Sequence, residues 1–466
     1  MAQTPRMSLA LTLPEILIDI FDLLEPHRPT LAAAIRVNRQ WFASGTDVLW
    51  RGALCEALAK VPGHRRQVYA SKITSISFYG EDEVAYHSCF ENLQFSRLRK
   101  IVLDVHHQRR PGAPEWYPIQ QYLQPPLEEF AFFGGYLDDL FLEHMLNTCF
   151  RLRSIMLHNP RRSISAEAFC GFITRCTWLT NMEFSYRMEH LISDELVLHL
   201  AKRTTLLNLV LGKIISMQIL RQISRNVVEP FKALRSLHIS ITALAVPLLV
   251  PLVKHITSLR LEVEDSDDSA HILQLISRLA DLRFLSLSFA AHTELSTEDL
   301  LSLRALSKLE QLSINADCSG DAAAVTAFNP GFSNSDFDSL CSALHCLRRI
   351  DFNVMCNMSA AALKSLQRYH PLLEECSLPL IFDMHALGLD KRRRVMFPEL
   401  RLLDVGAFRP PPAFSHRRRA GWIRPAAHVF AALMRRRFPK LEELYVQSDD
   451  SYSTDVVDAF ETSMGR

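Results

Sequence analysis

The sequence has 466 residues, of which 48% are hydrophobic and 22% are charged, and its formal net charge is +1. Such a composition is ordinary for a folded protein and argues against extensive disorder. The balanced charge gives no general electrostatic reason to expect a nucleic acid or an anionic membrane as a partner. The chain contains only 15 glycines, and this scarcity counts weakly against the glycine-rich phosphate loops of nucleotide enzymes.

Residues 9–60 predict a small helical module. One helical pattern opens at Leu13 and Pro14 and runs to residue 24, and further patterns cover residues 31–42 and 48–59. Proline suits a helix start because its missing N–H would have had no partner there. Short helices over about 45 residues make a marginal fold alone, so we expect a partner or the neighbouring domain to stabilise this module.

Two further features bear on the compartment. The apolar stretch 9–24 contains Pro14, Glu15, Asp19 and Asp22, which makes it a poor signal peptide and a poor membrane span. The ten cysteines include no C-x-x-C pair and match no zinc or redox motif. We therefore expect an intracellular protein, in the cytoplasm, the nucleus or both, with buried reduced cysteines and no cofactor or metal.

A short pattern recurs through most of the chain: one apolar residue, two variable residues, a second apolar residue, one variable residue and a third apolar residue. The alternation at its end is the period of a short strand with one buried face. Eleven of the thirteen spacings between successive copies lie between 22 and 29 residues, a period that scattered leucines would not hold. The copies begin at Ile73, Leu98, Leu127, Leu152, Leu179, Leu206, Leu234, Ile256, Leu282, Leu309, Leu347, Leu373, Leu400 and Leu441.

Amphipathic segments lie between these copies and begin with helix-capping residues, among them Ser165, Ser193, Ser296 and Ser359. A strand and a helix form one unit that cannot bury its apolar face alone, so the units must stack. The pattern resembles leucine-rich repeats over roughly residues 70–450. The resemblance implies an α/β solenoid of short parallel strands with outer helices, and leaves residues 451–466 as a C-terminal tail.

The N-terminal module resembles an F-box, through the order and spacing of Leu13-Pro14-Glu15-Ile16-Leu17, Ile20, Leu24, Leu31, Val37, Trp41 and Leu49-Trp50. This resemblance implies that the module binds a Skp-type adaptor, which joins a cullin scaffold carrying a RING protein and a ubiquitin-conjugating enzyme. The residues it assigns to adaptor contact are Leu13, Pro14, Ile16, Leu17, Ile20, Val37 and Trp41. A place in the module's own core is the alternative, above all for Ile20, Val37 and Trp41.

No catalytic signature is present: the sequence lacks a G-x-S-x-G elbow, an H-E-x-x-H helix and a P-loop. Residues 265–268 superficially resemble a calcium loop, but Ala270 and Ile276 stand where such a loop needs glycine and an acid. We therefore expect a protein that is not an enzyme.

Strand positions that face away from the helices form a concave surface in this architecture, and charges of both signs alternate along it. Mixed charge suits a protein or peptide partner better than a phosphate backbone, although a solvated face with cross-strand ion pairs explains most positions equally well. Candidate target contacts on this surface are Arg348, Arg349 and Tyr445.

Two insertions, residues 316–336 and 408–425, interrupt the repeat. The second holds Arg417, Arg418, Arg419 and Trp422, residue types that are enriched in interface hot spots. We expect target contact there, with a tolerated surface insertion as the alternative.

Together these features predict a substrate-recognition subunit of a Skp–cullin–F-box ubiquitin ligase that holds an unknown protein target through its repeats. Two other interpretations are open. The chain could be an F-box scaffold that acts outside ubiquitination, or a free leucine-rich-repeat interaction protein whose N-terminal helices cap the array.

Overall fold

The computed structural model describes residues 13–79, 84–104, 119–160, 164–265, 271–316, 323–328, 331–383, 387, 395–410 and 423–464. The chain divides into two compact units. The N-terminal unit comprises Met1–Leu200 with Thr205–Lys213, and the C-terminal unit comprises Ala201–Thr204 with Ile214–Arg466.

The N-terminal unit begins with a module of helices α1 (Pro14–Leu24), α2 (Arg28–Ala34) and α3 (Arg39–Leu49). Pro14 occupies the first turn of α1, and the Asn38 side chain caps α3 by accepting a 2.9 Å hydrogen bond from the Trp41 backbone N–H. These are the ordinary signals of helix starts. The module has its own small core, made of Leu17, Phe21, Leu31 and Val48.

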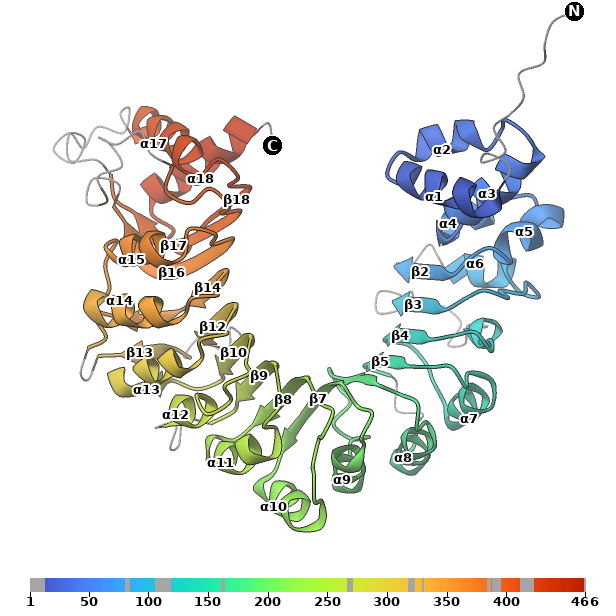
Figure 1. The fold of residues 1–466 in the computed structure, drawn as a ribbon, viewed down its shortest axis with the longest axis horizontal. Helices are drawn as coiled ribbons and strands as arrows, with labels where there is room; N and C mark the ends of the chain where they lie inside the picture. Colours follow the sequence, from blue (N-terminus) through green and yellow to red (C-terminus); the bar gives the residue numbers. More distant parts are fainter. Residues whose placement is uncertain are drawn as a thin grey trace, which may run out of the picture. The chain divides into compact units, whose positions relative to one another are not determined.

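The same unit continues as a parallel sheet in which each strand pairs with the next one along the chain. Helices cover one face of this sheet and leave the other face open (Figure 1). The strands are β1 (Gly52–Leu54), β2 (Ser75–Tyr79), β3 (Lys100–Asp104), β4 (Glu129–Phe133), β5 (Ser154–His158), β6 (Asn181–Phe184) and β7 (Asn208–Ile215). The helices are α4 (Cys55–Ala59), α5 (Gly63–Ala70), α6 (Val84–Cys89), η3 (Ile119–Tyr122), α7 (Asp139–Thr148), α8 (Ala166–Arg175) and α9 (Asp194–Lys202).

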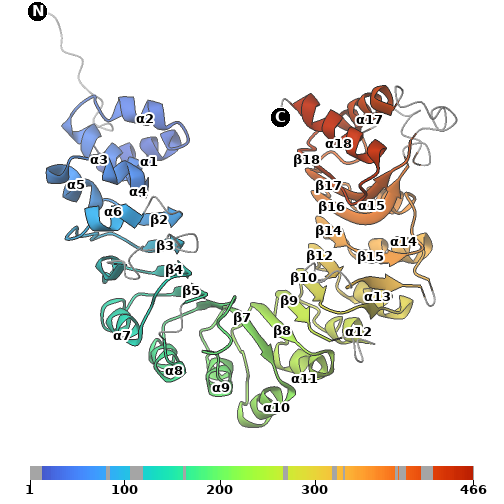
Figure 2. The same ribbon diagram turned by 180° about the vertical axis from the view of Figure 1, so that it is seen from behind.

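The C-terminal unit repeats this arrangement with helices over one sheet face (Figure 2). Its main strands are β8 (Ser236–Ile241), β9 (Ser258–Val263), β10 (Phe284–Phe289), β12 (Gln311–Ala316), β14 (Arg349–Phe352), β16 (Glu375–Phe382), β17 (Leu402–Phe408) and β18 (Glu443–Val446). Its helices are α10 (Met217–Asn226), η4 (Ala243–Ala245), α11 (Val246–Leu249), η5 (Val250–Leu252), α12 (Ile272–Ile276), α13 (Thr297–Ser302), η6 (Leu303–Ala305), α14 (Asn334–Ala343), α15 (Ala362–Tyr369), α17 (Ile423–Arg437) and α18 (Ser451–Met464). A separate small sheet pairs β11 (Thr293–Glu294), β13 (Val325–Ala327) and β15 (Val354–Cys356).

The repeat pattern explains these strands. In β10, Leu285 and Leu287 are fully buried between sheet and helices, whereas Ser286 between them faces the open side. Burial of two large apolar side chains per strand stabilises each unit only when its neighbours complete the core. A strand follows each of the fourteen predicted pattern starts, so the expected leucine-rich-repeat-like α/β fold is confirmed.

The structure differs from the sequence expectation at three points. Strand β1 pairs with β2, so the sheet already begins inside the segment assigned to the helical module. Strand β13 lies within the insertion 316–336. Residues 451–464 form helix α18, which buries Tyr452, Val456 and Phe460 and packs beside α17, so this segment is not a tail.

Candidate interaction sites

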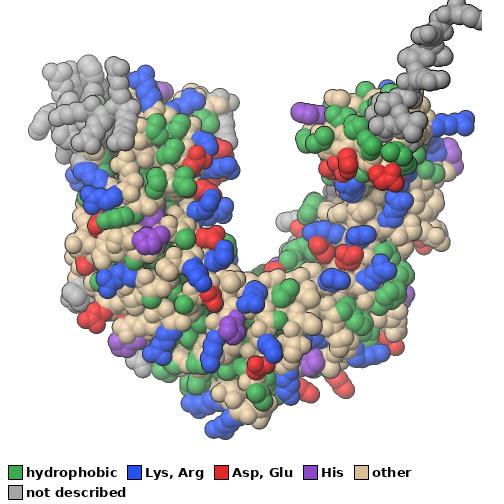
Figure 3. Space-filling model, in the orientation of Figure 1, with side chains coloured by type: hydrophobic (Ala, Val, Ile, Leu, Met, Phe, Trp, Pro, Cys, Tyr) green, Lys and Arg blue, Asp and Glu red, His purple; other side chains and the backbone are tan. Residues whose placement is uncertain are grey.

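The surface of the N-terminal module carries exposed apolar side chains (Figure 3). Leu13 at the start of α1 is 47% exposed, and Val37 between α2 and α3 is 57% exposed. Leu23 and Phe42, which the sequence did not single out, are exposed as well. A module with its own core therefore still presents apolar surface to a partner.

The other residues assigned to adaptor contact divide between surface and core. Pro14 is exposed, and Ile16 and Ile20 are half-buried. Trp41 is half-buried and packs edge-on against Phe21, with 5.6 Å between ring centroids. Leu17 is fully buried in the module core, so its assignment to a contact surface is corrected to a structural role.

Ion pairs tie this module to the first repeats. Asp47 of α3 lies 2.5 Å from Lys72 Nζ and 3.2 Å from Arg97 Nη1. Burial raises the pKa of Asp47, but the hydrogen bonds and charges of Lys72 and Arg97 outweigh burial and hold this pKa below its usual value. The neighbouring repeats thus supply the support that a module of this size needs.

The open sheet face of the N-terminal unit is mostly apolar along its central row, which runs from strand to strand in register. That row is Ser77, Val102, Ala131, Met156, Glu183 and Val210. Beside it, the rings of Phe133 and His158 meet edge to face at 4.7 Å, and His158 Nε2 lies 2.9 Å from Glu183 Oε1.

The corresponding row of the C-terminal unit is polar throughout. It runs through His238, Arg260, Ser286, Ser313, Asp351, Ser377, Asp404 and Tyr445, again in register. At one end, His238 Nε2 lies 2.8 Å from Glu262 Oε1 and the Ser240 hydroxyl donates to Glu262 Oε2 at 2.8 Å. The hydrogen bond from His238, the largest influence, outweighs partial burial and lowers the pKa of Glu262 to about 2.

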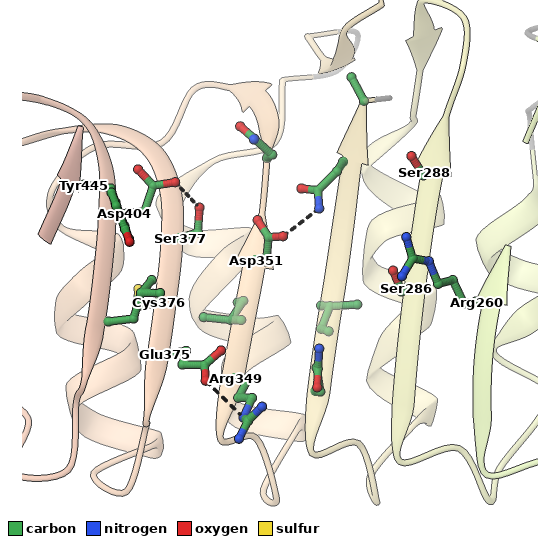
Figure 4. A pocket seen from close by; sticks show the side chains of 17 residues that line it. Arg260, Ser286, Ser288, Arg349, Asp351, Glu375, Cys376, Ser377, Asp404 and Tyr445 are labelled. Carbon is green, nitrogen blue, oxygen red and sulfur yellow. Dashed lines mark hydrogen bonds and ion pairs between the residues drawn. The ribbon is translucent and has the colours of Figure 1, made fainter. Parts of the chain in front are cut away.

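A hollow of about 560 Å³ lies on this polar face, between β9 and β18 (Figure 4). Its lining consists largely of hydroxyl, amide and charged side chains. Asp351 and Asp404 project into it from β14 and β17, with Ser377 of β16 between them. A hollow of this size and composition suits a polar segment of a partner.

Both aspartates accept hydrogen bonds from uncharged side chains. Asp351 Oδ2 accepts hydrogen bonds from Asn315 Nδ2 at 2.6 Å and from the Ser313 hydroxyl at 3.2 Å. Asp404 Oδ2 accepts from the Ser377 hydroxyl at 2.7 Å and from Gln447 Nε2 at 3.4 Å.

The target contacts expected from the sequence have different outcomes. Arg349 and Tyr445 line the hollow, whereas Arg348 is paired across the strands with Glu374 at 3.0 Å. Arg417, Arg418, Arg419 and Trp422 lie outside the described residues. Cross-strand ion pairs such as Lys100–Glu129, at 2.8 Å, confirm that part of the charged face neutralises itself.

The sequence interpretation passed over Asp351 and Asp404. It concentrated on charged residues at or just before the first strand residue, such as Arg348 and Arg349, and of its target contacts only Tyr445 lies between the last two apolar positions of a copy. The missed signal was their position as the variable residue between the last two apolar positions of a copy, which always faces the open side of the sheet.

The described residues give little sign of other chemistry. They contain no group of three or more His, Cys, Asp or Glu side chains that could hold a metal ion. Nor does any helix among them have the length and apolar character to cross a bilayer. Burial raises the pKa of the Cys149 thiol to about 12, so this thiol stays protonated and poorly nucleophilic.

Comparisons with known proteins find similar solved structures but no similar family model or curated sequence. No protein-family model matches the sequence, and no curated protein matches it significantly. A chain from the crystal structure of the Rad7 and Elc1 complex in yeast is 15% identical with a TM-score of 0.40, over 84% of this chain and 92% of that chain. The leucine-rich repeat-containing protein LegL7 from Legionella pneumophila is 10% identical with a TM-score of 0.29, over 76% and 96%. The order of strands and helices itself shows a leucine-rich-repeat-like α/β fold.

Proposed function

We propose that this chain is a substrate-recognition subunit of a Skp–cullin–F-box ubiquitin ligase, acting in the cytoplasm or nucleus. The N-terminal module binds a Skp-type adaptor and, through it, the cullin scaffold. The repeats hold a protein target. The observation that supports adaptor binding most directly is the exposure of Leu13 and Val37 on a module whose core other residues already fill.

The energetics of this surface favour a protein partner. Fully burying a leucine side chain contributes roughly 1.5–3 kcal/mol, and burying the exposed half of Leu13 contributes about half of that. Leu13 lies just before α1, is 47% exposed and is not one of the residues of the module core, so the exposed part of its side chain is available for contact. The adjacent Pro14 adds apolar area with a backbone already set for the helix.

In this role the chain contributes position rather than catalysis. A receptor that holds a target near the conjugating enzyme raises the effective concentration of the acceptor lysine. The chain then needs two separate surfaces, one for the adaptor and one for the target. The exposed surface of the helical module can serve the adaptor, and the open face of either sheet can serve the target.

The test is a double substitution at the start of α1. Leu13→Ala with Pro14→Ala removes apolar contact worth at least about 1.4 kcal/mol, which corresponds to a tenfold weaker Kd for a Skp-type adaptor. Leu140→Ala on α7 is the matched control, because Leu140 is 69% exposed and lies outside the module. Adaptor binding is measured by calorimetry with purified full-length chains.

Three outcomes decide between the candidate functions. If the unchanged chain binds no Skp-type adaptor, the F-box assignment is wrong and the helices serve as a cap. If the double variant binds as well as the unchanged chain, the contact face is wrong. If adaptor binding holds but no target accumulates when the chain is depleted, the chain acts as a scaffold outside ubiquitination.

A further inference from the structure

We propose that the hollow on the C-terminal sheet face binds a basic segment of a partner protein, with a Lys or Arg side chain opposite each of Asp351 and Asp404. This inference depends on the proposed function in one respect: it assumes that the basic segment belongs to the target protein. The site itself lies wholly within the C-terminal unit.

The first argument is the state of the two carboxylates. Among the described residues, neither Asp351 nor Asp404 forms an ion pair, and their hydrogen bonds come from hydroxyl and amide groups alone. Neighbouring acids on this face differ, because Glu262, Glu310, Glu374 and Glu375 all pair with a His or Arg. Two negative charges in the hollow therefore remain uncompensated.

The cations nearest to the hollow do not fill this role. Arg349 extends toward Glu375, with 3.5 Å between Nε and Oε1. Arg260 stands on β9, three strands from Asp351 on β14, a separation of about 14 Å at the usual strand spacing. No cation of the described residues therefore pairs with Asp351 or Asp404, and a cation supplied by a partner would meet two carboxylates without an ionic partner.

A second, independent observation also calls for a hydrogen-bond donor. Asn315 lines the hollow, and among the described residues no group hydrogen-bonds to its buried side-chain oxygen. A buried acceptor left unsatisfied costs about 1–3 kcal/mol. Guanidinium and ammonium groups carry several donors and no acceptor, so they satisfy both carboxylates and this amide oxygen.

The rest of the lining suits the backbone of such a segment. Ser286, Ser288, Gln311 and Asn353 offer hydroxyl and amide groups along the same face. Asp351 and Asp404 are two strands apart, about 10 Å at the usual spacing. A segment in the polyproline II conformation rises about 3.1 Å per residue and has three residues per turn, so it spans this distance in about three residues with both side chains on the same side. The segment would therefore cross the strands with basic side chains about three residues apart.

The test uses a defined probe and the full-length chain without adaptor. A fluorescein-labelled peptide of three Gly-Ser-Arg repeats is compared, by fluorescence polarisation, with the same peptide carrying citrulline in place of arginine. Citrulline keeps the shape and removes the charge. We expect the arginine peptide to bind at least tenfold more tightly, and to lose that advantage in Asp351→Asn with Asp404→Asn.

The matched control is Asp281→Asn with Asp458→Asn, which removes two exposed carboxylates outside the hollow and should leave binding unchanged. Equal binding of both peptides overturns the proposal, as does an unchanged affinity in the hollow variant or no arginine-peptide binding up to about 1 mM. Because the assay lacks adaptor, loss of adaptor binding would refute the proposed function and leave this inference standing.

Discussion

The two units have sheets built from the same repeat, but the side chains on their open sheet faces differ. In the N-terminal unit the open face carries Val102, Ala131 and Met156 in its central row, whereas the C-terminal unit carries Ser313, Asp351 and Ser377 at the equivalent positions. The inward neighbours are large and apolar in both units. The fold therefore depends on one set of alternating positions, and the open face varies independently of it.

This separation matters because repeats stack through their inward residues alone. A substitution on the open face alters what the surface can bind without removing a core contact. The polar row of the C-terminal unit and the mostly apolar row of the N-terminal unit thus suit chemically different partners.

The largest expected effect is the difference in unfolding free energy between substitutions at inward-facing and at outward-facing strand positions. Phe184→Ala in the N-terminal unit and Phe289→Ala in the C-terminal unit each remove a fully buried ring and should lower the free energy of unfolding by about 3–5 kcal/mol. Met156→Ala, on the open face, should cost less than about 1 kcal/mol. Urea unfolding monitored by circular dichroism measures these changes, and an equal cost for Met156 would break the comparison.

Acid should destabilise the N-terminal unit through His87. This imidazole is fully buried, with Nδ1 at 2.9 Å from the Tyr122 hydroxyl, and burial lowers its pKa to about 4. The unfolded chain takes up the proton near pH 6.5, so stability falls by up to about 3 kcal/mol between pH 6.5 and 4. His87→Phe should flatten this part of the stability–pH curve. A slope unchanged by the substitution would contradict the assignment.

In the C-terminal unit the carboxylate of Glu262 should make stability depend on pH in a lower range than His87 does. The pKa of Glu262 is about 2 in the folded protein and near 4.5 when unperturbed, so its contribution is present above pH 4.5 and is lost as pH falls toward 2. The shift sets an upper limit of about 3 kcal/mol, and 40% exposure of the side chain reduces the expected value to about 1–2 kcal/mol.

Glu262→Gln tests that value. Chemical unfolding at pH 7 should show the variant less stable by about 1–2 kcal/mol, with the difference vanishing near pH 2. His238→Gln serves as the companion variant, because it removes the partner at 2.8 Å and should produce a similar loss at pH 7. Equal stability of all three chains would show that this ion pair is fully screened.

Much of the fold could be predicted from the sequence because the repeat is carried by inward leucines and phenylalanines, whose period is visible without a structure. Strand β1 escaped prediction because Gly52–Leu54 is too short to show alternation. Helix α18 escaped because nothing in residues 451–464 reveals that α17 offers it a packing surface.

The candidate sites were harder to predict for a related reason. Leu17 has the same apolar character as Leu13, and only the packing around Phe21 and Leu31 shows that Leu17 belongs to the core. Asp351 and Asp404 are single acids in separate copies, and their shared surface arises from strand register rather than from nearness in the sequence.

The smallest expected effect concerns the stability of the hollow variant. Asp351→Asn with Asp404→Asn retains an acceptor oxygen for Ser313 and Ser377, so the free energy of unfolding should change by less than about 1 kcal/mol. Thermal unfolding of the variant beside the unchanged chain measures this. A large loss would mean that the two carboxylates support the sheet rather than a partner.

The most direct test of the account is hydrogen exchange of the full chain with and without a purified Skp-type adaptor. The account predicts slower exchange confined to residues 13–50, which hold α1, α2 and α3, and unchanged exchange in strands β8–β18. No protection in this module, or protection only in the repeats, would contradict adaptor binding through the N-terminal helices.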